Sequence, residues 1–202
     1  MVEEPKQTMH KRGTYDESKI RHLDDTEHIR TRPGMYIGRL GDGSHAEDGI
    51  YVLLKESIDN SIDEFNEGFG KRIEVSIDND RAATIRDYGR GIPLGSLVDA
   101  VSKLNTGAKY DTSVFTASVG LNGVNALSLK FVVRSYREGR MHEATFERGR
   151  LQEEHYEDTH EEDGTYVYFE PDPELFLHFH FEDETVDTML RNYTYLNTGL
   201  AI

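Results

Sequence analysis

The chain has no cysteine and no tryptophan, and its bases are far fewer than its acids. Without cysteine it can form neither a disulfide nor a thiolate metal site. The 38 acidic residues against 23 lysines and arginines give a formal net charge of -15. Such a chain would repel the phosphate backbone of DNA, so we do not expect it to grip nucleic acid by itself.

Long apolar runs are also missing. No stretch is long enough to cross a membrane, and the N-terminus lacks the basic and then apolar pattern of a secretion signal. We therefore expect a cytoplasmic protein with no membrane contact. At 202 residues the chain can bury one substantial core, so a single domain is the expected organisation.

Hydrophobic periodicity divides the chain into helical and extended segments. Helices are predicted at about 48–66, 95–104, 121–129 and 182–196, and a short one opens at Asp24 and Asp25. Strands are predicted at 72–78, 82–87, 130–137, 142–147, 151–156 and 165–170. Helices followed by strands in meander order favour an α/β (α+β) sandwich, with one mixed, mostly antiparallel sheet and helices on one face.

Two segments differ from this pattern. Residues 1–18 are polar and aperiodic, which predicts a flexible N-terminal arm, and residues 19–202 are predicted to form the domain. Acidic residues concentrate at 153–163, where seven of eleven positions are Asp or Glu between two strand patterns. We interpret this acidic run as a solvated hairpin tip.

Two polar segments carry the candidate chemistry. In residues 53–65 apolar side chains recur at helical spacing, so Glu56, Asn60 and Asp63 share one helix face. About thirty residues later, Asp87 ends a strand pattern and precedes a Gly-x-Gly-x-Pro segment, which lets the backbone pass close to a ligand. Acidic and amide groups in this arrangement are what an ATP site requires.

These segments, in this order, resemble the GHKL ATPases, and more closely the ATPase domain of the B subunits of bacterial type IIA topoisomerases. Further matches to that family lie at 32–38, 104–110, 118–124, 125–128 and 164–165. The resemblance runs from about Tyr15 to the last residue. The residues at 48–51 and 103–107 are more similar to topoisomerase IV than to gyrase. The resemblance implies a Bergerat-type ATPase fold that uses ATP and Mg²⁺.

The resemblance implies a role for each polar candidate. Glu56 would be the general base, and Asn60 would ligate Mg²⁺ through its side-chain oxygen. Asp63 is interpreted either as supporting the site or as lining the helix edge. Asp87 would accept a hydrogen bond from the adenine N6 amine, with Thr165 bound to the ring through a water. Around the base would lie Ile58, Arg90, Gly91, Ile92, Pro93, Arg137 and Val167, of which Arg90 would be at the pocket mouth and Arg137 at the rim used by aminocoumarins.

The phosphates would lie beyond the adenine pocket. A Gly-rich turn ahead of a helix offers backbone N–H donors, and this turn comprises Gly120, Leu121, Asn122, Gly123 and Val124. Lys109 could add a point charge, although a solvated loop lysine is the alternative. Tyr15 corresponds to an arm residue that touches the nucleotide of the other protomer, or else it is an ordinary tail residue.

Two departures from the family pattern limit the expected activity. Roughly five lid residues, including a phosphate-contacting glycine, are missing between Val124 and Asn125, through either deletion or omission of a segment. Triphosphate binding should therefore be weakened more than adenine binding. The resemblance also implies a lysine that contacts the γ-phosphate from a following transducer domain, and we do not expect that domain in this fragment. We therefore expect this fragment to bind ATP and to hydrolyse it slowly or not at all on its own.

The family places its chemistry within a larger assembly. The resemblance implies a homodimer formed through the topoisomerase B chains, a heterotetramer with the topoisomerase A chains, DNA held by other domains, and ATP-competitive inhibitors as ligands. The function expected is that of the topoisomerase IV B chain, in which ATP-driven dimer closure is coupled to DNA strand passage. The alternatives are the equivalent gyrase domain and, if the short lid is real, a nucleotide-binding module that does not hydrolyse ATP.

Overall fold

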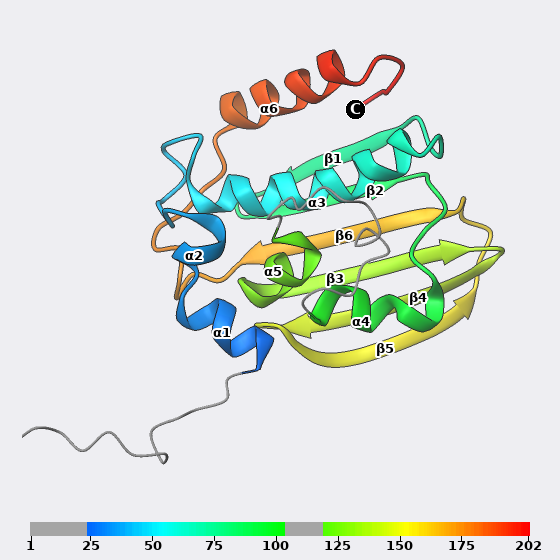
Figure 1. The fold of residues 1–202 in the computed structure, drawn as a ribbon, viewed down its shortest axis with the longest axis horizontal. Helices are drawn as coiled ribbons and strands as arrows, with labels where there is room; N and C mark the ends of the chain where they lie inside the picture. Colours follow the sequence, from blue (N-terminus) through cyan, green and yellow to red (C-terminus); the bar gives the residue numbers. More distant parts are fainter. Residues whose placement is uncertain (1–23, 104–118) are drawn as a thin grey trace, which may run out of the picture.

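The computed structural model describes residues 24–103 and 119–202 (Figure 1). The predicted arm, Tyr15 and Lys109 lie outside these described residues. No helix in the described part of the chain combines the length and apolar character that a membrane span needs.

Six strands form one sheet, and β6 lies in its middle although it comes last in the sequence. The strands are β1 (Ile73–Asp78), β2 (Ala82–Asp87), β3 (Ser128–Arg137), β4 (Arg140–Glu147), β5 (Arg150–Asp158) and β6 (Gly164–Pro171). Their order is β1-β2-β6-β3-β4-β5, and each neighbouring pair is antiparallel. An isolated parallel bridge joins Arg72 and Ala201 beside β1.

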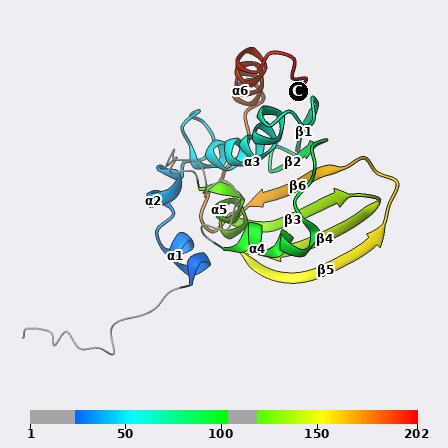
Figure 2. The same cartoon turned by 45° about the vertical axis from the view of Figure 1, so that its right-hand side comes forward.

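The helices lie together on one face of the sheet, which confirms the predicted fold class. They are α1 (Asp25–Thr31), α2 (Gly34–Ile37), α3 (Gly49–Asn66), the 3-10 turn η2 (Leu94–Ser96), α4 (Leu97–Ser102), α5 (Gly120–Ala126) and α6 (Asp183–Leu196). Figures 1 and 2 show α3, α4 and α5 against the sheet and α6 beyond α3 on the β1 side. Within the described residues the other face of the sheet carries no helix.

The core lies between α3 and the inner face of the sheet. Ile50, Leu53, Leu54 and Ile58 are fully buried along α3, at the spacing of one helical face. Alternate strand residues belong to the same buried cluster, among them Ala83, Ile85, Phe131, Val133, Val167 and Phe169. This packing fixes the long acidic helix across β2 and β6, so the polar face of α3 is held near the end of β2.

The interpretation of the acidic run as a hairpin tip was wrong in part. The edge strand β5 continues to Asp158, so the first half of the run lies on the strand, and only 159–163 form the turn. Each β5 residue is exposed, and among the described strands β5 pairs with β4 alone. Charged side chains are a common means of protecting such an edge from pairing with another sheet.

Candidate functional site

Helix α3 places the predicted base Glu56 next to the first residue of α5. The Glu56 side chain is buried, and its Oε2 accepts a hydrogen bond from the Gly120 backbone N–H at 2.9 Å. Asn60 and Asp63 follow on the next turns of the same helix face and are half-buried. The structure therefore brings Glu56 together with the start of the predicted phosphate segment, across 64 residues of sequence.

Asp87, the last residue of β2, is 2% exposed and receives three hydrogen bonds. Its Oδ1 accepts from the backbone N–H groups of Gly89 at 3.0 Å and Thr165 at 3.1 Å. Its Oδ2 accepts from the Ser61 hydroxyl at 3.0 Å. Burial raises the pKa of the Asp87 carboxyl, against the lowering effect of these donors. An oxygen with two lone pairs and one donor can accept another, so Oδ2 keeps capacity for an external N–H.

Ser61 was not among the predicted site residues. Sequence reasoning treated the stretch around it as an apolar helix face with polar neighbours. A small hydroxyl within a buried stripe, beside Ile58 and Ile62, was the available signal, because a buried hydroxyl needs a hydrogen-bond partner. The partner proves to be Asp87, which couples α3 directly to the end of β2.

The loop after Asp87 is fastened to strand β3. Gly91 has φ +72°, and a Cβ there would lie 2.7 Å from the Tyr136 carbonyl oxygen, so glycine is required for this close approach. Arg137 Nη1 donates to the Gly91 carbonyl at 3.1 Å, and the Ser135 hydroxyl donates to the Ile92 carbonyl at 2.5 Å. Arg137 is thus engaged by the loop itself, while Ile92 is half-buried and Pro93 is exposed.

Arg90 lies at the C-terminal end of α3. Its guanidinium donates to Glu64 at 3.1 and 2.9 Å and also pairs with Glu67. These two carboxylates raise the pKa of Arg90, and its guanidinium carbon lies 4.1 Å from the ring centroid of Phe69. The Arg90 guanidinium, predicted to lie at the pocket mouth, is thus paired with carboxylates of the acidic helix and of the residue just after it.

The predicted phosphate segment is a helix here and not an open turn. Residues Gly120 to Val124 form most of α5, and the helix continues through Asn125 to Ala126 without a break. Leu121, Gly123 and Val124 are buried, whereas Gly120 and Asn122 are half-buried. The Asn125 side chain donates to the Val101 carbonyl at 2.8 Å, so the short connection is packed against α4. The phosphate roles of this segment stay predictions.

The predicted apolar walls lie deeper than the polar groups. Ile58 is fully buried, Val167 is 2% exposed, and both belong to the main core cluster. Thr165 is the second residue of β6, the strand that also carries Val167, and it is likewise 2% exposed. Ser61 of α3 and Thr165 of β6 both donate to Asp87, whereas the fully buried Ile58 offers little surface to a ligand.

Helix α6 is joined to the acidic helix by a contact that sequence reasoning missed. The Tyr193 hydroxyl donates to Asp59 Oδ1 at 2.5 Å, and Lys55 donates to Asp59 Oδ2 at 2.5 Å. Burial and the neighbouring Asp59 carboxylate raise the pKa of the Tyr193 phenol. The Tyr193 hydroxyl therefore ties α6 to α3 at Asp59, the residue before Asn60.

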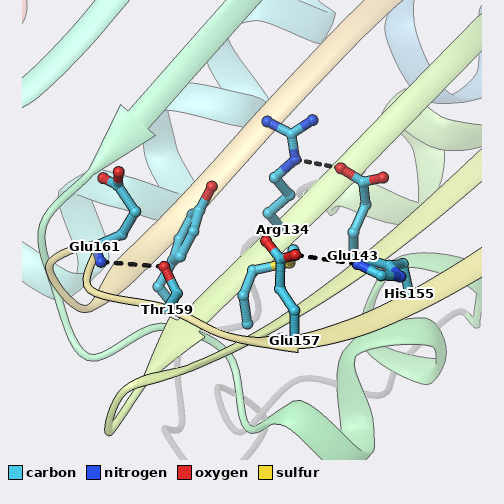
Figure 3. A pocket seen from close by; sticks show the side chains of 8 residues that line it. Arg134, Glu143, His155, Glu157, Thr159 and Glu161 are labelled. Atoms are coloured by element: carbon cyan, nitrogen blue, oxygen red, sulfur yellow. Dashed lines mark hydrogen bonds and ion pairs between the residues drawn. The ribbon is translucent and has the colours of Figure 1, made fainter.

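A hollow of about 340 Å³ lies on the opposite, helix-free face of the sheet (Figure 3). Its polar side chains mostly bind one another: Arg134 pairs with Glu143, and His155 Nε2 lies 3.2 Å from Glu157 Oε2. Arg134 alternates with the buried Val133 and Ser135 and so points away from α3. We therefore do not assign nucleotide chemistry to this hollow.

A metal ion would find one candidate ligand near the base. Within residues 24–103 and 119–202, no three His, Asp or Glu side chains gather in a way that could hold an ion. Mg²⁺ usually keeps several waters and takes only one or two protein ligands together with substrate phosphates. The side-chain oxygen of Asn60, one turn from Glu56, fits that kind of site.

Comparisons with known proteins agree with this geometry. The family model of the histidine kinase-, DNA gyrase B- and HSP90-like ATPase matches residues 45–175. The B subunit of DNA topoisomerase 4 from Borreliella burgdorferi is 53% identical over 197 residues, covering 95% of this chain and 33% of that protein. The B subunit of DNA gyrase from Clostridium acetobutylicum is 36% identical over 207 residues, covering 95% and 32%.

A solved structure has the same architecture. The 43K ATPase domain of Thermus thermophilus gyrase B, in complex with an aminocoumarin, superposes with a TM-score of 0.77 at 34% identity and covers 88% of this chain and 47% of that chain. The present chain spans about a third of the length of the curated relatives. The family model and the 53% identical relative agree on the family, and the six-stranded sheet with helices on one face agrees with the solved structure. The chain belongs to the histidine kinase-, DNA gyrase B- and HSP90-like ATPase family.

Proposed function

We propose that this chain is the ATP-binding region of a type IIA topoisomerase B chain of the topoisomerase IV kind. The identity of 53% to a topoisomerase 4 relative, against 36% to a gyrase relative, supports this subtype over gyrase. The observation that carries the nucleotide function is the buried Asp87 carboxylate, which has three internal donors and capacity for one more. An exocyclic adenine amine supplies such a donor.

The adenine would lie between α3 and the loop that follows Asp87. Asp87 Oδ2 would accept from the N6 amine, and Thr165 would bind the ring through a water. The loop walls at Gly91 and Ile92 are already held to β3 by Arg137 and Ser135, so the pocket is largely preformed. Preformed walls lower the ordering cost of ligand binding.

Hydrolysis would use the part of α3 that carries Glu56 and Asn60, ahead of Ser61 in the sequence. Glu56 would accept a proton from the attacking water, and the Gly120 N–H holds its carboxylate in a fixed orientation. Mg²⁺, bound by Asn60 and the triphosphate, would offset phosphate charge. Because Gly120 already donates to Glu56, its N–H is free for a phosphate only if that hydrogen bond opens.

The remaining functions belong to the longer relatives and are proposed here by extension. They are a homodimer closed by ATP, a heterotetramer with the topoisomerase A chains, DNA strand passage and a cytoplasmic location. The charge of -15 supports a division in which other domains hold the DNA. The aminocoumarin in the Thermus gyrase complex supports an ATP-competitive inhibitor site over the same pocket.

Asp87→Asn tests the adenine site. The new amide oxygen can still accept from Gly89 and Thr165, and the Ser61 hydroxyl can turn to accept from the new NH₂ group. That NH₂ would then face the adenine amine, donor against donor. We expect affinity for a non-hydrolysable ATP analogue with Mg²⁺ to fall by about tenfold or more, measured by calorimetric titration.

The control is Asp187→Asn, an exposed α6 position that pairs with Arg191 and lies in no predicted site. Equal affinity of wild type and Asp87→Asn would contradict the adenine assignment. An adenine-pocket inhibitor that binds while the ATP analogue does not would identify the short lid as the defect. Failure of both ligands to bind the wild type would overturn the proposed function.

A further inference from the structure

A third side chain holds the loop that follows Asp87, and the predicted nucleotide contacts do not account for it. Arg137 and Ser135 bind the carbonyls of Gly91 and Ile92. The carbonyl of Leu94, at the far end of the loop, lies 2.8 Å from His142 Nδ1 on β4. The loop thus crosses the ends of β6, β3 and β4 and is fixed at both ends, as Figure 1 lets the reader follow.

His142 is 2% exposed and bound at both ring nitrogens. Nε2 lies 3.0 Å from Glu154 Oε1 on β5, and the ring stacks on Tyr156 with centroids 3.8 Å apart. A backbone carbonyl and a carboxylate can only accept hydrogen bonds, so the ring donates to both at once only when both nitrogens carry a proton. A neutral ring can donate to just one of these two acceptors.

Among residues 24–103 and 119–202, few charged groups lie around this ring. From β5, Glu154 and Tyr156 contact the His142 ring. The alternate residues His155 and Glu157 line the hollow on the opposite face, where Figure 3 draws them. Neighbouring elements contribute Arg140 at the start of β4, Arg137 on β3, which is held by Gly91, and the Asp99–Lys103 pair on and beside α4. Glu154 is the carboxylate within hydrogen-bond distance of the ring.

We propose that His142 is a positioning residue for the nucleotide-facing loop, acting through the chain Glu154–His142–Leu94. The proposal rests on the proposed function, because the loop matters only if it walls the adenine pocket. A neutral ring keeps one proton, and the hydrogen bond to a carboxylate is about twice as strong as one to a carbonyl. The remaining proton therefore stays on Nε2, toward Glu154. The Nδ1 lone pair then faces the Leu94 carbonyl oxygen, and the hydrogen bond that holds this end of the loop is lost.

The affinity for nucleotide should therefore depend on pH, and this dependence should change when Glu154, the partner of His142 Nε2, is replaced. In the wild type, we expect affinity for the non-hydrolysable ATP analogue with Mg²⁺ to fall about three- to tenfold from mildly acidic to mildly alkaline pH. In Glu154→Gln, the amide can donate to Nε2, so a neutral ring keeps its Nδ1 proton on Leu94. That variant should hold nearly constant affinity over the same range.

Two further variants complete the design. His142→Phe keeps the stacked ring but has no donor, so it should bind weakly at every pH. Glu153→Gln removes the same charge from the adjacent β5 position, whose side chain lies on the other face, and should follow the wild-type pH profile. Parallel profiles for Glu154→Gln and Glu153→Gln would overturn the proposal. Nucleotide protonation is common to all variants and cancels in the comparison.

A nucleotide-free readout separates this proposal from the proposed function. Nitrogen-15 spectra of the imidazole should show both His142 nitrogens protonated at mildly acidic pH, and the Leu94–Ser96 amide signals should move when the ring loses its proton. A single protonated nitrogen would overturn the proposal whether or not nucleotide binds. Unchanged nucleotide affinity in Asp87→Asn would instead count against the proposed function, and the imidazole spectra would still report whether His142 holds the Leu94 end of the loop.

Discussion

In the full-length protein, Glu56→Gln is expected to bind ATP but to hydrolyse it about 10²- to 10⁴-fold more slowly than the wild type. The glutamine keeps an oxygen that can accept from the Gly120 N–H, so the contact between α3 and α5 survives. What is lost is the carboxylate proposed to take the proton of the attacking water. Phosphate release under steady state and binding of a non-hydrolysable analogue should be measured on the same preparation.

Glu47→Gln provides the matched control. Glu47 is an exposed acid just before α3, and its substitution by glutamine removes the same charge as Glu56→Gln. It should leave both turnover and binding at wild-type levels. Undiminished turnover in Glu56→Gln would exclude Glu56 as the base. Loss of analogue binding in that variant would instead indicate that the contact with Gly120 organises the phosphate end of the site.

Asp172→Ala is expected to lower the free energy of unfolding by about 3–5 kcal/mol. Asp172 is fully buried and accepts from Arg30 Nη2 at 2.6 Å, from Arg148 Nε at 2.8 Å and from the Glu174 backbone N–H at 3.0 Å. Removing it leaves two partly buried guanidinium groups without their shared carboxylate. The interaction ties α1, the turn after β4 and the segment after β6 together, so its loss should affect the whole domain.

Urea unfolding followed by circular dichroism would measure this loss. Asp187→Ala is the control, since its pair with Arg191 is an exposed i,i+4 contact whose removal should cost less than about 1 kcal/mol. A difference between the two variants below about 1 kcal/mol would show that the buried cluster contributes no more than a surface pair.

The same carboxylate gives the stability a defined dependence on pH. Burial raises the pKa of Asp172, but the hydrogen bonds from Arg148, Glu174 and Arg30 outweigh it, and the pKa lies below its ordinary value. A lowered acid pKa contributes stability above the pKa of the unfolded chain, about 3.9, and this contribution disappears as the pH falls through the folded value. The stability difference between wild type and Asp172→Ala should therefore narrow below about pH 4.

Local periodicity was enough to predict the parts of the site that lie on single elements. The helical repeat put Glu56 and Asn60 on one face of α3, and the strand alternation before Gly89 put Asp87 at the end of β2. Asp24 was also expected at the start of a helix, and its carboxylate caps the Glu27 N–H of α1 at 2.8 Å.

Contacts between separate helices and strands could not be predicted from local periodicity. Ser61 meets Asp87 across 26 residues, and Gly120 meets Glu56 across 64. The first contact joins α3 to the end of β2 and the second joins α3 to the start of α5, and no local pattern specifies how these elements pack. The helix predicted at 121–129 was wrong in its last residues for another reason. Its apolar residues suit a buried helix or a strand equally well, and the chain changes from α5 to β3 within it at Ser128.

The central place of β6 also determines when the domain can mature during synthesis. The β1–β2 hairpin and the β3–β4–β5 meander each form from neighbouring sequence, but β6 alone bonds to both. The Thr165 N–H reaches Asp87 across 78 residues, a long-range closure of the kind that slows folding. A nascent chain that has not yet released β6 would hold two unjoined half-sheets with exposed apolar faces, a state open to misassembly and chaperone capture. Nucleotide competence would then arise in one late step, as the last strand inserts.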